Sequence, residues 1–189
     1  MNAFLPEILL GDITMKTRCM IFVLALALIP ALQAAAVETP STYHRLGNWQ
    51  VHGDSPHYLA FGLGAFDIDE EPVGAARVEL RFGRKLFFVG PAIGLLANTD
   101  GGYFGYAGIY ADISYKNLVI TPMAAGGGYE EGEGIDLGGI FQFRATLTLA
   151  YQFDNLSRLG VQLGHLSNGG THDSNPSEQD AFVTFAIPF

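Results

Sequence analysis

The stretch DLGGIFQFRATLTLAYQF, residues 136–153, decides the fold class of this chain. Its odd positions carry mostly apolar side chains with aromatic rings near both ends, whereas its even positions are mostly polar or small. Because successive side chains of a β-strand point to opposite faces, this period of two predicts one strand with an apolar face and a polar face. The run is long for a soluble sheet. It therefore indicates a strand that crosses a membrane as part of a β-barrel.

The rest of the chain repeats this alternation. In residues 74–83, the charged residues Arg77, Glu79 and Arg81 stand between apolar neighbours, and we expect them, with Arg144, to form a network in the barrel interior. Eight strands are predicted in all, at 57–67, 74–83, 86–97, 102–115, 117–127, 136–153, 158–167 and 179–189. The predicted fold is an all-β, eight-stranded antiparallel transmembrane β-barrel. A secreted soluble β-barrel or sandwich is the alternative.

The start of the chain has the order of a secretory signal peptide. Lys16 and Arg18 precede an apolar run from Met20 to Leu32, and small residues follow up to Ala36. The apolar run is too short to span a bilayer as a helix, which needs about 20 residues. We expect residues 1–36 to be a signal peptide, with Met15 as an alternative start, and residues 37–189 to form a single barrel domain in the bacterial outer membrane.

Composition excludes several classes of function. The net charge is −9, which argues against a basic nucleic-acid groove. The only cysteine, Cys19, lies in the predicted signal peptide, so thiol catalysis and disulfides are excluded for the predicted domain. Acidic residues crowd the loops around 67–71 and 130–136, where we expect them to be solvated. Neither a metal nor another cofactor is predicted.

Two residues of the predicted strand 158–167 have the chemistry of a hydrolase. His165 and Ser167 are two positions apart, so they share a face, and Val161 and Leu163 on the same face indicate that it contacts lipid. Their Cα atoms are expected about 6.5–7 Å apart. Side chains can close that gap to a hydrogen bond, which is what a serine nucleophile needs from its base. The plainer interpretation is an interfacial histidine and a serine that begins a loop.

The surrounding sequence resembles a known family. The segment HLSNGG at 165–170, the pair Asn175-Pro176 and a final strand that ends in Ile-Pro-Phe at 187–189 resemble the outer-membrane lipid A 3-O-deacylases of the PagL type. The resemblance in the motif is limited to about the last 25 residues, while the eight-strand pattern agrees over the rest. It implies a cofactor-free esterase that removes the acyl chain linked at position 3 of lipid A, within the lipopolysaccharide of the outer leaflet.

The resemblance also implies a role for each residue of the motif. Ser167 would be the nucleophile and His165 its general base. The side chain of Asn175 and the backbone N–H of Gly170 would stabilise the oxyanion. Asn168 matches the motif and is expected to hold the loop.

The third member of the site is where this sequence departs from the family. The family's acidic partner follows the histidine by 14 residues, and that position is Gln179. Gln179 shares the outward parity of the last strand, so a regular strand would direct Glu178 and Asp180 away from His165. A loop or bulge at 176–178 would instead let Glu178 reach the histidine. We predict Glu178 as the catalytic partner, with Gln179 as the alternative and Asp180 left open.

Two other functions remain open. A non-catalytic small barrel that serves as a scaffold or adhesion surface would have no need of His165, Ser167 and Asn175 on its lipid face. A related phospholipid acyl hydrolase would share the chemistry and differ in substrate. The expected partner is lipid A in the outer leaflet of the outer membrane, with a homodimer as one assembly left open.

Overall fold

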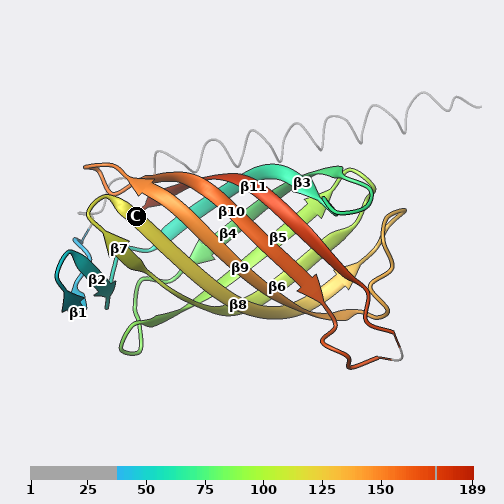
Figure 1. The fold of residues 1–189 in the computed structure, drawn as a ribbon, viewed down its shortest axis with the longest axis horizontal. Coiled ribbons are helices and arrows are strands. Elements are labelled where there is room, and N and C mark those ends of the chain that lie inside the picture. The colour runs from blue at the N-terminus through green and yellow to red at the C-terminus, as the bar shows by residue number, and fades with distance from the viewer. Residues whose placement is uncertain (1–37, 173) are drawn as a thin grey trace, which may run out of the picture. The chain divides into compact units, whose positions relative to one another are not determined.

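A computed structural model describes residues 38–172 and 174–189, and the predicted signal peptide lies outside this part of the chain. Eight antiparallel strands lie side by side and close on themselves (Figure 1). They are β3 (Tyr58–Phe66), β4 (Val73–Arg81), β5 (Val89–Asn98), β6 (Tyr103–Ala111), β8 (Leu118–Glu130), β9 (Phe141–Gln152), β10 (Arg158–Ser167) and β11 (Ser177–Pro188). Because β11 pairs with β3 from Asp180–Phe66 to Pro188–Tyr58, the barrel is closed. The predicted eight-stranded antiparallel barrel is confirmed.

The side chains of β9 show why these residues form a barrel. Exposed and buried positions alternate along nearly the whole strand, as the sequence pattern predicts. Outward residues such as Leu147 and Leu149 are about half exposed, whereas inward Arg144 is almost completely buried. An apolar outer surface combined with a polar interior is the arrangement that a bilayer stabilises.

Buried ion pairs fill the interior. Glu79 pairs with Arg77 at 2.9 Å and with Arg81 at 2.6 Å, and it accepts a hydrogen bond of 2.7 Å from Tyr106. These contacts confirm the network predicted on β4. Arg144 makes no ion pair with Glu79, because it pairs with Asp180 of β11 inside the barrel.

The connections at the two ends of the barrel differ. At the end where β3 begins and β11 ends, the strands are joined through residues 82–88, 116–117 and 153–157. The opposite end carries the loops 67–72, 99–102, 131–140 and 168–176, and it is called the loop end from here on (right in Figure 1). The candidate residues of β10 and β11 lie at this end.

Several predicted boundaries are wrong. The strand expected at 136–153 begins only at Phe141, because residues 136–140 belong to the loop. There Gly138 has a φ of 76°, and its N–H donates to the side chain of Asp136 at 2.7 Å. The turn expected at 84–85 extends over residues 82–88, and it is closed by an isolated bridge between Leu86 and Val89.

A small hairpin outside the barrel was not predicted. It consists of β1 (Thr42–Leu46) and β2 (Trp49–His52), and β2 pairs with β7 (Ile113–Tyr115), which continues β6 past Asp112. Its strands have five and four residues, and β1 is exposed on both faces. A strand exposed on both faces leaves no alternation of apolar and polar residues from which to predict it.

The part of the chain that the structure describes lacks two features. In residues 38–172 and 174–189, no helix is long and apolar enough to cross a membrane. The same residues contain no group of three or more His, Cys, Asp or Glu side chains placed to hold a metal ion.

Candidate active site

The last three residues of strand β10 include His165 and Ser167, which both face the outside of the barrel. Leu163 precedes them on the same face and is 60% exposed. His165 is half-buried, while Ser167 is 9% exposed. The pair therefore lies at the loop end of the apolar belt, with His165 partly covered and Ser167 almost completely covered.

Regular pairing with β11 decides which side chain meets the histidine. His165 lies directly opposite Gln179, and Ser167 lies opposite Ser177. The side-chain amide nitrogen Nε2 of Gln179 is 2.7 Å from Nδ1 of His165. Gln179, predicted as the alternative partner, is therefore the residue that contacts the histidine.

The prediction that Glu178 reaches His165 is wrong for this structure. Pairing between β10 and β11 continues without a bulge from Asp180 to Ser177, so Glu178 points into the barrel. Its Oε2 accepts the backbone N–H of Asp67 at 3.2 Å, and its Oε1 lies 4.0 Å from Arg144. Asp180, which had been left open, also faces inward and binds Arg144. Neither carboxylate contacts the histidine.

The hydroxyl of Ser167 has no hydrogen bond to the ring of His165 within the described residues. On its two sides are Phe143 of β9 and Ser177 of β11. Directly paired side chains in an antiparallel sheet have Cβ atoms about 4.5–5.5 Å apart. Ser177 is thus a second hydroxyl beside Ser167, and strand parity with Gln179 would have identified it in the sequence.

Asn168 makes several hydrogen bonds within and beside the loop that follows the serine. Its side chain is fully buried and donates to the carbonyl oxygens of Leu137 at 2.9 Å and Ser174 at 2.7 Å. Its Oδ1 accepts the N–H of Gly170 at 2.9 Å. Gly169 and Gly170 have φ values of 65° and 76°, a region that glycine enters without steric cost.

The two predicted oxyanion donors differ in their surroundings. The N–H of Gly170 is occupied by Asn168, so it can donate to a substrate only after this turn changes. Asn175 lies in the same loop and is exposed, and its side chain has no hydrogen bond within the described residues. The structure does not bring Asn175 into contact with either His165 or Ser167.

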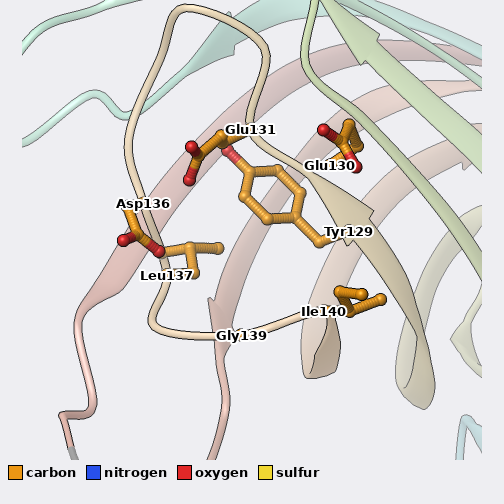
Figure 2. A pocket seen from close by; sticks show the side chains of 7 residues that line it. All are labelled: Tyr129, Glu130, Glu131, Asp136, Leu137, Gly139 and Ile140. Carbon is orange, nitrogen blue, oxygen red and sulfur yellow. The ribbon is translucent and has the colours of Figure 1, made fainter.

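The loop between β8 and β9 is tied to this site from the other side. Its pocket is lined by Tyr129, Glu130, Glu131, Asp136, Leu137, Gly139 and Ile140 (Figure 2). The carbonyl of Leu137 accepts the hydrogen bond from Asn168, so this bond joins the 131–140 loop to the 168–176 loop. None of the predicted catalytic residues lines this pocket, and its carboxylates, at the end of β8 and in the loop, are exposed.

A closed antiparallel barrel with an apolar outer belt and a charged interior defines a protein of the bacterial outer membrane. The family model for lipid A 3-O-deacylase (PagL) matches residues 35–187. This chain therefore belongs to the lipid A 3-O-deacylase (PagL) family.

A solved structure has the same fold. It is described as the outer membrane enzyme PagL, and it matches with a TM-score of 0.55 over 70% of this chain and 99% of its own. The two sequences are 15% identical, so this likeness supports the fold alone. No curated protein sequence matches the chain.

Proposed function

We propose that this protein removes the 3-O-linked acyl chain of lipid A, with Ser167 as nucleophile and His165 as general base. The observation that carries the proposal is the shared outward face of these two residues at the loop end of the apolar belt, in a chain of the PagL family. A lipid ester can reach this face by lateral movement, without entering the barrel.

The proposed reaction has two halves. The Oγ of Ser167 adds to the ester carbonyl and its proton passes to Nε2 of His165. Collapse of the tetrahedral intermediate breaks the bond to the sugar oxygen, which takes the proton from His165 and leaves an acyl-serine. Water then repeats the sequence, releases the 3-hydroxy fatty acid and restores the serine.

Donors for the oxyanion would come from the 168–176 loop. The exposed amide of Asn175 is free to turn toward a bound ester. The N–H of Gly170 would join it if substrate binding displaces Oδ1 of Asn168. Removal of one such donor costs about 10²–10³ in kcat where it has been measured in other enzymes.

The outer leaflet is the proposed location of the site. Both ends of the barrel chain, at the start of β3 and the end of β11, lie opposite the loop end. In bacterial barrels, short turns face the periplasm and longer loops face outward. This orientation would place His165 and Ser167 at the leaflet in which lipid A resides.

The test is mass spectrometry of lipid A from a bacterial host that expresses the protein. Wild type should yield lipid A that lacks one ester-linked 3-hydroxyacyl chain, and Ser167→Ala should leave lipid A intact. Ser177→Ala is the matched control, because it removes a hydroxyl from the paired position on the same face. We expect Ser177→Ala to retain most of the activity.

The same extracts separate the alternatives. Lysophospholipid in place of deacylated lipid A would identify a phospholipid acyl hydrolase. Unchanged lipids with both wild type and Gln179→Glu, each a correctly folded, heat-modifiable barrel, would contradict the deacylase proposal and favour a scaffold.

A further inference from the structure

The contact between His165 and Gln179 bears on which nitrogen of the imidazole ring carries the proton, and the inference drawn from it rests on the proposed function. The two residues are direct cross-strand partners, and the amide nitrogen of Gln179 is 2.7 Å from Nδ1 of His165. Within the described residues, this is the only hydrogen bond of the Gln179 side chain. In this contact the amide nitrogen of Gln179, and not its Oε1, faces the ring.

A neutral imidazole has one N–H and one acceptor nitrogen, and the partner of one nitrogen decides the state of the other. An amide N–H can donate to Nδ1 only if Nδ1 carries no proton. The ring proton is then on Nε2, the nitrogen assigned to take the proton of Ser167. In this tautomer His165 cannot act as the base.

Rotation of the Gln179 amide by half a turn exchanges its nitrogen and oxygen, so that the oxygen faces Nδ1 of His165. The carbonyl Oε1 of Gln179 would then accept a proton from Nδ1, and Nε2 would be free to act as base. A carboxylate has acceptors only, so a glutamate at this position would permit the productive tautomer alone. Glutamine permits both.

The neighbouring carboxylates do not compensate. Glu178 accepts the N–H of Asp67, and Asp180 is bound to Arg144, both inside the barrel. The regular pairing of β10 with β11 keeps both on the opposite face of the sheet from the histidine. The choice of tautomer is thus left to Gln179.

The geometry points to Gln179 as a positioning residue that holds His165 in the resting tautomer, with the proton on Nε2, so that turnover requires rotation of the amide. The site is then assembled but held at low activity by one side chain. In a serine protease, exchange of the triad carboxylate for an amide gives the wrong tautomer and lowers kcat by about 10⁴.

The first measurement is the tautomer itself. The barrel is labelled with ¹⁵N-histidine, refolded in detergent micelles and studied by NMR under mildly alkaline conditions that keep imidazole rings neutral. His165→Asn assigns the signals of residue 165. Wild type should carry the proton on Nε2, and Gln179→Glu should move it to Nδ1. A proton on Nδ1 in wild type would overturn the inference and leave the deacylase proposal standing.

The second measurement is the rate of deacylation by wild type, Gln179→Glu and Gln179→Leu. Gln179→Glu should raise kcat at least tenfold, and the limit is about 10⁴-fold if the tautomer alone is limiting. Gln179→Leu removes the resting contact that keeps the proton on Nε2, so its activity should exceed that of wild type. If Gln179 merely orients the ring productively, Gln179→Leu would lose activity, which would contradict the inference.

The two proposals fail in different ways. Should the NMR signals behave as expected while no variant releases an acyl chain, the tautomer assignment stands and the deacylase proposal fails. Gln179→Glu combined with Ser167→Ala should be inactive, because any gain must still pass through the nucleophile. Heat-modifiable migration on gels confirms that each variant is folded.

Discussion

Replacement of Arg144 by methionine should destabilise the barrel. The guanidinium is almost completely buried and makes two contacts with the carboxylate of Asp180, one of them 2.9 Å long. Glu178 lies 4.0 Å away. Among the described residues, Arg144 is the only cation within ion-pair distance of either carboxylate. Methionine keeps much of the volume and leaves both acids unpaired.

The expected cost follows from that loss. Removal of one partner from a buried ion pair costs about 3–5 kcal/mol, because the remaining charge stays in a medium that solvates it poorly. A loss of 3 kcal/mol changes the ratio of folded to unfolded protein by more than about 100-fold. Arg144→Met should lower the free energy of unfolding by this amount.

The matched variant removes the charge of Asp180 as well. Replacement of a buried ion pair by apolar residues is often neutral or stabilising. Arg144→Met with Asp180→Leu should therefore recover at least half of the lost stability, with Glu178 as the one carboxylate still unpaired. The difference between the double variant and the two single variants gives the coupling energy.

The assay is urea unfolding of the barrel refolded into phospholipid vesicles, followed by the circular dichroism of its β-structure. Fluorescence of Trp49 is a poor probe, because that residue lies in the small hairpin, with its ring centroid 5.1 Å from that of Tyr115 on β7, and reports on the hairpin. A cost below about 1 kcal/mol for Arg144→Met would refute the reasoning, since it is the size expected for an exposed pair. The reasoning would also be refuted if the double variant lost as much stability as the two single variants lose together.

Two further changes test the belt and the loop. Leu163→Arg places a charge on the lipid face near the middle of β10 and should cost about 2–4 kcal/mol in the same unfolding assay, whereas no loss would show that this face does not contact acyl chains. Asn168→Ala removes the buried hydrogen bonds to Leu137 and Ser174. Proteolysis of the 168–176 loop in intact vesicles should therefore become faster, and deacylation should become slower. An unchanged rate of proteolysis would show that other contacts hold the loop.

The alternation along β9 and β4 was sufficient to predict the barrel, because every second side chain must suit either lipid or a polar interior. Boundaries were less predictable. Residues 136–140 were expected to belong to β9, yet the positive φ of Gly138 and its bond to Asp136 form a loop there, and the strand starts only at Phe141. Local hydrogen bonds of this kind leave no trace in a pattern of apolar and polar residues.

The sequence by itself determined that His165 and Ser167 share the outer face of the penultimate strand, because their separation of two residues requires it in any regular strand. It left Glu178 and Gln179 as alternative partners of His165, since one bulge exchanges the two faces of a strand. Only the tertiary structure decided between them. Contacts of Glu178 with Asp67 and Arg144 lie inside the barrel, the pairing with β10 stays regular, and Gln179 therefore lies against the histidine.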